Sequence, residues 1–324
     1  EGCGRYKRHE RHCRSSFGHK GSFIKVKRRG AYAPPSLFME KVIIVLNAYQ
    51  RPGAQVSKAN RLKDELEKLG AEAEIVRNFR LADVVNGTTF SKYRCKCVFL
   101  DKDKSAAYLL EKAGCRLFNN ARAMELCDDK MLTHAALCGA GINMPKTIYA
   151  PLCYYPDAPV PEEFLKGVGE SLGYPLVAKL CYGSLGAGVF LIEDFGALCA
   201  FESRYKLQAH LFQQFIVPAG TDVRCIVVAG KFLCAMKRTN EGDFRSNIEL
   251  GGHGEKYEPD DDMIAMCERA AAVLGLDYCG IDVLIGEDGK KYLCEVNSNA
   301  FFAEAERVCG VNIAKKFAEL IISE

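Results

Sequence analysis

The chain has 324 residues, with 44 Lys and Arg against 41 Asp and Glu, and a formal net charge of +3. A hydrophobic content of 48% with 26% charged residues is ordinary for a globular protein and excludes general disorder. No apolar run approaches the ~20 residues of a membrane-spanning helix, and the basic N-terminus lacks the apolar segment of a signal peptide. We therefore expect a cytoplasmic protein without a membrane partner, whose sixteen cysteines are reduced and mostly in the core.

The positive charge is concentrated at the N-terminus. Residues 1–38 hold ten basic residues against Glu1 and Glu10, which leaves 34 basic and 39 acidic residues in the rest of the chain. This segment shows neither helical nor strand periodicity, and its His and Cys residues match no familiar zinc spacing. We expect a basic disordered tail or a non-native extension before a start at Met39. The body is mildly acidic, which disfavours nucleic acid as a partner.

The first part of the body alternates strands and helices. Short apolar runs predict strands at 42–46, 73–76, 97–100 and 116–118. A helix capped by Ser57 and stopped by Gly70 separates the first two strands, and a second helix ends at Gly114. This alternation predicts a doubly wound α/β domain over 39–126.

The second part predicts an α+β arrangement with antiparallel sheets. A helix is expected from near Asp128 to Gly139 or Gly141, then a Pro- and Tyr-rich loop over 145–170 and strands at 174–180 and 189–192. Two hairpins follow with a helix between them. The first pairs 224–228 with 231–236, the helix covers 262–274, and the second hairpin pairs 281–285 with 292–296 around a turn at 288–289.

The last hairpin carries the sharpest chemical signal. A two-residue turn at 288–289 places Asp282 opposite Glu295, and Asn297 on the same face of the sheet. Facing acids repel unless a cation lies between them, and hard oxygen ligands suit Mg²⁺. The sequence therefore predicts a magnesium site, with a solvated sheet face paired to lysines as the alternative.

A glycine-rich loop and two lysines indicate an anion-binding site. The loop Gly183-Ser184-Leu185-Gly186-Ala187-Gly188 joins two strands, and Lys179 lies on the strand that enters it. Such loops let backbone N–H groups approach phosphates, although an ordinary hairpin loop has the same composition. Lys130, after Asp129, lies in the first turn of its helix, where a cation opposes the helix dipole and can share an anionic ligand with it. An exposed lysine paired with Asp129 is the alternative.

A basic set precedes the acidic hairpin. Arg224, Arg238 and Arg245, together with Asp222, could clamp carboxylate or phosphoryl oxygens. Single surface arginines carry no such signal, so the prediction rests on their concentration in one stretch.

These features in this order resemble the ATP-grasp superfamily, specifically the RimK-type α-L-glutamate ligases. The resemblance runs from about Lys41 to the C-terminus, and residues 1–38 have no counterpart in it. It is carried by the following ordered motifs: 128–130 Asp-Asp-Lys, 177–179 Val-Ala-Lys, 183–188 Gly-Ser-Leu-Gly-Ala-Gly, 213–216 Gln-Gln-Phe-Ile, 220–224 Gly-Thr-Asp-Val-Arg, 236–238 Met-Lys-Arg, 244–247 Phe-Arg-Ser-Asn and 295–299 Glu-Val-Asn-Ser-Asn.

The resemblance implies an ATP-grasp fold: an N-terminal α/β domain at 39–126, then α+β subdomains at 127–216 and 217–324 that enclose ATP. It implies ATP-binding roles for Lys130, Lys179, Gly183, Ser184, Gly186, Gly188, Gln214, Phe215, Ile216, Asp222 and Arg224. It places Mg²⁺, or Mn²⁺ instead, on Asp282, Glu295 and Asn297, with Arg238, Arg245 and Asn247 around the transferred phosphoryl group. Gln214 departs from the family, in which an acid often occupies this position, and so do Leu185 and Ala187, where longer polar residues are common.

The implied reaction joins a small-molecule or peptide carboxylate to an amino-acid amine, glutamate or a similar one, through an acyl phosphate. The resemblance leaves a homo-oligomer open. Two rival functions remain: a small-molecule kinase on the same fold, and a nucleotide-binding module without catalysis. His134, His210 and His253 could act as bases, although a structural role suits each better.

Overall fold

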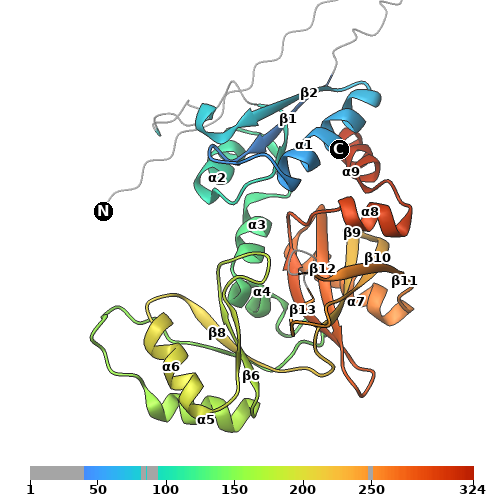
Figure 1. Ribbon diagram of the computed structural model, residues 1–324. Helices are drawn as coiled ribbons and strands as arrows, with labels where there is room; N and C mark the ends of the chain where they lie inside the picture. The colour runs from blue at the N-terminus through green and yellow to red at the C-terminus, as the bar shows by residue number, and fades with distance from the viewer. Residues whose placement is uncertain (1–39, 82–84, 86–93, 247–250) are drawn as a thin grey trace, which may run out of the picture. The chain divides into compact units, whose positions relative to one another are not determined.

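The computed structural model describes residues 40–81, 85, 94–246 and 251–324, and its helices and strands form three sheets with helices packed on them (Figure 1). Residues 39–324 form one compact unit. The predictions made for residues 1–38 lie outside the described ranges. Among the residues described, no helix combines the length and apolar character needed to cross a membrane.

The first sheet is parallel, with strand order β2-β1-β3-β4. Its elements are β1 (Lys41–Leu46), α1 (Ala54–Lys68), β2 (Glu72–Arg77), the short 3₁₀ helix η1 (Asn78–Arg80), β3 (Lys96–Phe99), α2 (Lys104–Lys112) and β4 (Arg116–Phe118). All four predicted strands are confirmed, within one or two residues of their expected ends.

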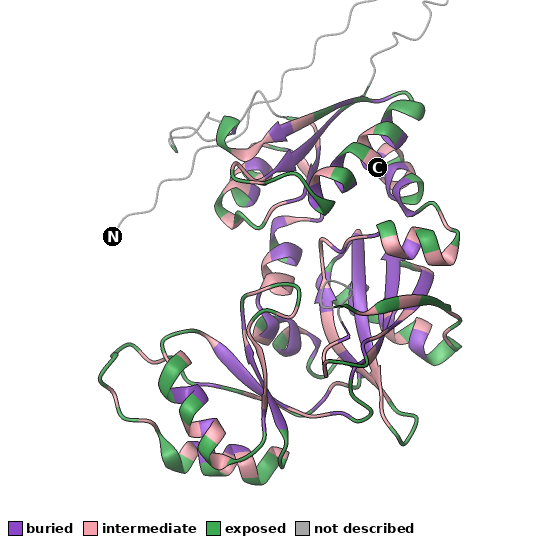
Figure 2. Ribbon diagram, in the orientation of Figure 1, coloured by how far each residue is buried: buried purple, intermediate pink, exposed green. Residues whose placement is uncertain are grey.

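Both faces of this sheet are buried, as Figure 2 shows for β1. Because side chains alternate along a strand, Val42 and Ile44 pack in one core with α1, and Ile43 and Val45 in another with α2. This confirms the doubly wound prediction. The expected cap at Ser57 is wrong: α1 begins at Ala54 after Gly53, and no side chain caps it.

Two short helices, α3 (Ala121–Asp128) and α4 (Lys130–Leu137), follow β4 where a single helix from Asp128 was expected. Asp129 lies between them in an extended conformation, and its carboxylate accepts hydrogen bonds from the backbone N–H groups of Met131 and Leu132. A side chain that satisfies free N–H groups in this way starts a helix, so α4 begins at Lys130.

The second sheet has strand order β5-β8-β6-β7 and is antiparallel. Helices α5 and α6 pack on it around Phe212 and Leu176. The prediction that 145–170 is all loop is wrong, because this stretch contains β5 and the start of α5. The elements are β5 (Thr147–Tyr149), α5 (Glu162–Leu172), β6 (Leu176–Leu180), β7 (Val189–Ile192), α6 (Phe195–Tyr205) and β8 (His210–Gln214).

The third sheet, with strand order β11-β10-β9-β12-β13, is also antiparallel and carries both predicted hairpins. Helix α7 covers one face, and the chain ends in two further helices. The elements are β9 (Thr221–Val228), β10 (Lys231–Thr239), β11 (His253–Tyr257), α7 (Asp261–Leu274), β12 (Tyr278–Ile285), β13 (Lys291–Asn297), α8 (Ala303–Cys309) and α9 (Ile313–Ser323).

The β12–β13 hairpin reaches the predicted register by a different route. Asp282 does pair with Glu295, but Gly286 N donates to Lys290 O (2.8 Å), so the loop is longer than a two-residue turn. Val283 pairs with Leu293, which makes Cys294 the extra residue of a β-bulge. The bulge shifts the register by one residue and brings the two acids opposite each other.

Helix α9, at the C-terminal end of the chain, packs against α1. Its buried Phe317 and Ile321 belong to the same core as Leu62 and Leu66 of α1. This core also contains Ile226 of β9, so it joins the first sheet to the third. The fourteen cysteines of the described ranges form no disulfide, and seven of them are buried.

Candidate functional site

The glycine-rich loop lies over a pocket between the second and third sheets. Gly183 and Ser184 line this pocket from the loop, and Gln214, Phe215 and Ile216 line it where β8 ends. Gly183 has φ +144°, and a Cβ there would lie 2.9 Å from Ala187 O, so the loop conformation requires glycine at this position.

Two buried lysines meet at this pocket. Lys130 starts α4 and Lys179 lies on β6, and each is only 8% exposed. Lys130 Nζ donates to Gly183 O (3.1 Å) and lies 3.6 Å from the Glu295 carboxylate. Lys179 Nζ contacts only the Cys294 sulfur (3.4 Å) among the described side chains. Because a buried ammonium is costly without a counter-charge, the pocket is suited to an anion.

The acid pair at the base of the pocket is neutralised within the protein. Asp282 accepts two hydrogen bonds from Arg224, both 2.7 Å, and lies 3.0 Å from Arg238. Burial would raise the pKa of Asp282, but these two guanidinium groups outweigh it and hold the pKa below its usual value. Arg238, 2% exposed, also makes an ion pair with Asp222. Arginines thus supply the charge that compensates Asp282, so the facing acids alone do not require a metal, and the magnesium site stays a prediction.

The oxygen donors nevertheless suit Mg²⁺. Asn297 Nδ2 is 3.4 Å from Asp282 Oδ2, and Glu295 precedes Asn297 by two residues on β13, so three oxygen-bearing side chains converge. Within the described ranges, no cluster of three His, Cys, Asp or Glu side chains forms a metal site. The candidate set is thus two carboxylates and one amide, which matches a Mg²⁺ ion that takes its other ligands from phosphate and water.

Arg245 holds the glycine-rich loop instead of projecting freely into the pocket. Its guanidinium donates to Gly186 O (2.9 Å) and forms a bidentate pair with Asp243 (2.9 and 2.7 Å). Since Arg245 precedes the third sheet's edge strand β11 and Gly186 belongs to the second sheet's loop, this contact joins two sheets across the pocket.

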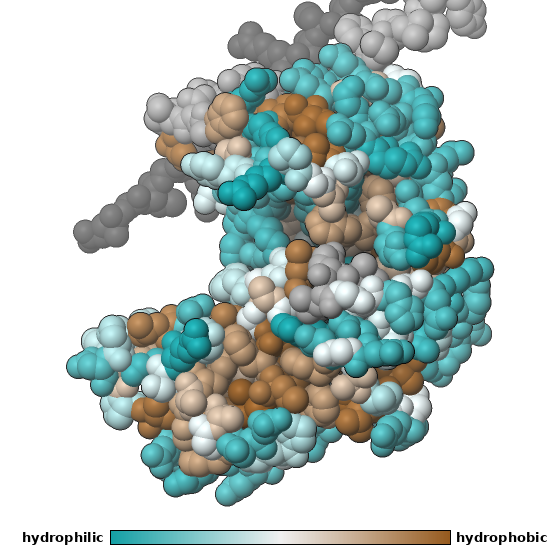
Figure 3. Space-filling view, in the orientation of Figure 1, coloured by the Kyte–Doolittle hydropathy of each residue, from teal (hydrophilic) through white to brown (hydrophobic). Residues whose placement is uncertain are grey.

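Apolar residues for which no binding role was predicted complete the pocket. Val177, Leu284 and Phe244 line it beside the predicted Phe215 and Ile216. Figure 3 shows apolar surface gathered over the part of the chain that carries β6 and β8. An apolar wall next to buried cations is suited to a ligand with one flat apolar end and one anionic end.

Two of the three histidines named as possible bases, His134 and His210, are buried and hydrogen-bonded within the protein, and the third, His253, is exposed. His134 Nδ1 contacts Lys130 O (2.8 Å) and its Nε2 contacts Gln213 Nε2 (2.9 Å), while burial lowers its pKa. His210 Nε2 pairs with Glu202 (2.9 Å), and His253 is exposed at the start of β11. None of the three lines the pocket.

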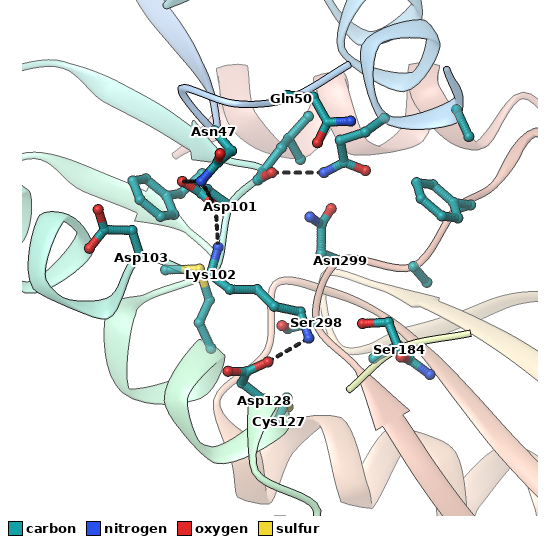
Figure 4. Close-up of a pocket in the computed structure, with 18 of the residues that line it drawn as sticks. Asn47, Gln50, Asp101, Lys102, Asp103, Cys127, Asp128, Ser184, Ser298 and Asn299 are labelled. Carbon is teal, nitrogen blue, oxygen red and sulfur yellow. Dashed lines mark hydrogen bonds and ion pairs between the residues drawn. The ribbon is translucent and has the colours of Figure 1, made fainter. Parts of the chain in front are cut away.

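A larger cavity of about 690 Å³ adjoins the pocket (Figure 4). Its walls come from the carboxyl ends of β1 and β3, from the end of α3 and from the segment after β13. Ser184, Leu185 and Glu295 line both the cavity and the pocket, so the two spaces meet beneath the glycine-rich loop. Binding in this cavity was not predicted, because its walls come from distant parts of the sequence.

Most of the predicted residues meet at this site. Pocket residues include Lys130, Lys179, Gly183, Ser184, Gly186, Gln214, Phe215, Ile216, Asp222, Arg238, Arg245, Asp282 and Glu295. Arg224 and Asn297 line the larger cavity instead, and Gly188 lines neither space. Asn247 lies outside the described residues.

Comparisons with known proteins agree with this geometry. A family model described as a RimK-like ATP-grasp domain matches residues 127–321. N-acetylaspartylglutamate synthase A of Homo sapiens is 33% identical over 230 residues, which are 69% of this chain and 56% of that protein. A probable alpha-L-glutamate ligase of Maridesulfovibrio salexigens is 34% identical over 215 residues, 65% of this chain and 68% of that protein. The chain thus spans little more than half the length of the human synthase.

Solved structures show the same fold. A RimK domain protein from Sphaerobacter thermophilus superposes with a TM-score of 0.65 at 25% identity, over 86% of this chain and 98% of that one. The ATP-grasp ligase PsnB, solved with a minimal precursor, Mg and ADP, gives a TM-score of 0.64 at 19% identity, over 87% and 97% of the two chains.

Proposed function

The chain belongs to the RimK-like ATP-grasp family, and from this premise we propose that it is an ATP-dependent carboxylate–amine ligase. In the proposed reaction, ATP phosphorylates a carboxylate to an acyl phosphate, an amine attacks its carbonyl carbon, and phosphate leaves as the amide forms. One observation carries the proposal. Lys130 and Lys179, both buried and from different elements, meet in one pocket beneath the glycine-rich loop, and in the described part of the chain they share a single carboxylate contact, of 3.6 Å, between Lys130 and Glu295.

The nucleotide would occupy this pocket. The two lysines would bind its phosphates, and the backbone of the glycine-rich loop would cover them. The apolar wall at Leu284, Phe215 and Ile216 suits the base, and Gln214 lies beside it. We assign residues 39–126 to the N-terminal domain, 127–216 to the first ATP-grasp subdomain and 217–324 to the second.

We propose that Asp282, Glu295 and Asn297 hold Mg²⁺, with Mn²⁺ as a substitute that takes the same oxygen ligands. When bound, the ion neutralises charge on the nucleotide phosphates. Arg238, which is held by Asp222 and Asp282, would stabilise the phosphoryl group without reorganising. We extend the same role to Arg245 and Asn247.

The acid and amine substrates would bind in the larger cavity. Its opening beneath the glycine-rich loop, at Ser184 and Glu295, gives a bound carboxylate access to the phosphates. We propose glutamate or a similar amino acid as the amine, because a relative is described as a probable alpha-L-glutamate ligase. For the acid, the name of the human synthase suggests N-acetylaspartate as the first candidate.

The test is a product analysis with purified protein, Mg-ATP, glutamate and a panel of acids that includes N-acetylaspartate and citrate. We expect phosphate release that requires both acid and amine, and a new amide mass. Glu295→Gln should abolish both while the protein stays folded. Phosphate transfer to a hydroxyl without an amine would establish the rival kinase, and ATP binding without turnover on any acid would contradict the ligase.

A further inference from the structure

A buried lysine on α1 contacts the segment that follows β13. Lys58 is 3% exposed, although it belongs to a helix of the first sheet. Its Nζ donates to Asn299 Oδ1 (2.7 Å) and to Ala300 O (2.8 Å), and it lies 4.8 Å from the centre of the Tyr278 ring. No carboxylate of the described ranges pairs with it. Helix formation does not require a buried cation here, so the contacts of Lys58 matter for the residues that it binds.

The contact fixes which way the Asn299 amide points. In its ammonium form Lys58 has three donors and no acceptor, so only the amide oxygen can face it. The oxygen and nitrogen of an amide are bonded to the same planar carbon and point in different directions, so Asn299 Nδ2 does not face Lys58. Asn299 lines the larger cavity together with Gln50 and Ser298 (Figure 4). Its Nδ2 has no protein partner in the described part of the chain.

The neighbourhood favours an oxygen acceptor over an amine as the ligand. Asn299 offers N–H donors to the cavity and its oxygen is already occupied by Lys58. The Lys58 charge lies directly behind it, and the guanidinium of Arg224 lines the same cavity. At Asn299 itself a carboxylate or carbonyl oxygen would meet an N–H donor, whereas the carboxylates that line other parts of the cavity, Asp101, Asp103, Asp128 and Glu295, would attract an ammonium group there.

We propose that Asn299 binds a non-reacting oxygen of the acid substrate through Nδ2, and that Lys58 is the positioning residue that holds this amide in its donor orientation. That the ligand is a substrate rests on the proposed ligase function, but its binding at Asn299 can be tested without turnover. Asn299 lies two residues after Asn297, so a ligand held here has its other end close to the proposed metal and phosphates.

The first experiment measures binding by calorimetry with the full chain saturated with Mg-ADP. N-acetylaspartate, citrate and glutamate are titrated separately. Asn299→Ala should weaken the carboxylate that binds wild type at least tenfold, with Mg-ADP affinity within twofold of wild type. Asn60→Ala, at an exposed position on α1 that lines neither space, is the matched control and should change nothing.

A second substitution separates substrate binding from structural support. Asn299→Asp keeps an oxygen for Lys58 but replaces the cavity-facing donor with an acceptor. We expect it to weaken carboxylate binding at least as much as Asn299→Ala. If Asn299 served only to satisfy Lys58, Asn299→Asp would bind like wild type, and the proposal would be overturned.

Lys58 is tested with Lys58→Met, against Lys63→Met on the solvent side of α1 as control. We expect Lys58→Met to raise the KM for the acid about tenfold with a smaller change in kcat and an unchanged KM for ATP. A change in all three parameters together would indicate a merely structural lysine. If no carboxylate binds the wild type at millimolar concentration, the acid subsite is wrong. If a carboxylate binds but no phosphate is released, only the ligase function fails.

Discussion

At the scale of single residues, the pocket is marked by a buried lysine for which the described residues offer no carboxylate partner. Lys179 is the plainest case, because the thiol of Cys294 is the one hydrogen-bond partner of its Nζ among the described residues. Burial raises the pKa of that thiol, so it stays protonated and leaves the ammonium uncompensated. A phosphate oxygen would give Lys179 a negatively charged partner, which the described residues do not provide.

Removing this charge should weaken nucleotide binding. We expect Lys179→Met to lower the affinity for Mg-ATP about 10- to 100-fold, the range of one charge-assisted hydrogen bond of about 1.5–3 kcal/mol. Calorimetry with a non-hydrolysable ATP analogue measures it. Lys166→Met, on the exposed face of α5, removes an equal charge and should leave the affinity unchanged. Equal affinities in the two variants would exclude Lys179 from the phosphate site.

The buried Lys58 predicts a pH dependence of stability. Burial lowers its pKa from 10.5 to about 7, so between these values the unfolded chain binds more protons than the folded one. The free-energy cost of burying the charged Lys58 is therefore complete below pH 7 and decreases as the pH rises. Relative to Lys58→Met, the wild type should gain about 1 kcal/mol of unfolding free energy per pH unit between pH 7.5 and 8.5. Urea unfolding of both proteins measures this, and parallel curves would contradict it.

At the scale of elements, periodicity identified most of the strands and helices, because buried strands and amphipathic helices have distinct apolar patterns. Short elements were not predicted: β5 has three residues and no clear apolar pattern, and a single residue, Asp129, divides α3 from α4. The bulge at Cys294 was not predictable, since nothing in the sequence distinguishes an extra residue from a paired one. It nevertheless decides that Asp282 meets Glu295.

Two glycines with the same backbone conformation give a prediction for the glycine-rich loop. Gly188 has φ +76° and Gly289 has φ +75°, but a Cβ at 188 would lie 3.0 Å from Leu180 Cβ while nothing lies within 4 Å at 289. Gly289→Ala should cost about 1 kcal/mol through backbone strain alone. Gly188→Ala should cost about 1 kcal/mol more through overpacking, as measured by chemical unfolding. Equal losses would show that Leu180 moves aside without cost.

At the scale of the whole molecule, long-range contacts set the site, and the sequence cannot reveal them. Lys58 lies 241 residues from Asn299, and Arg224 lies 58 residues from Asp282. The family resemblance named most of the residues that line the proposed nucleotide pocket, although they are far apart in the sequence. The arginines that pair with Asp282 lie in two of the family's motifs, but their distance from Asp282 in the sequence hides the pairing, so the charge balance at the acid pair was not predicted.

The shared core of α9 and α1 predicts cooperative unfolding. Phe317→Ala should destabilise the protein by about 3–5 kcal/mol, the usual cost of emptying a buried aromatic site. Hydrogen exchange should then rise together in β1 and β9, because both strands border this core. Lys316→Ala, on the exposed side of the same helix, should have little effect. Faster exchange confined to α9 would show that the helix opens alone.

The pairing of Asp282 with two arginines couples the two binding spaces. Arg238 reaches it from the nucleotide pocket and Arg224 from the larger cavity, so one carboxylate is shared by groups that line two different binding spaces. A ligand that draws either guanidinium away changes the charge that the other one meets. Occupancy of the two spaces is then thermodynamically linked, and the linkage is reciprocal. If the bound nucleotide changes the affinity for the acid by some factor, the bound acid changes the affinity for the nucleotide by the same factor.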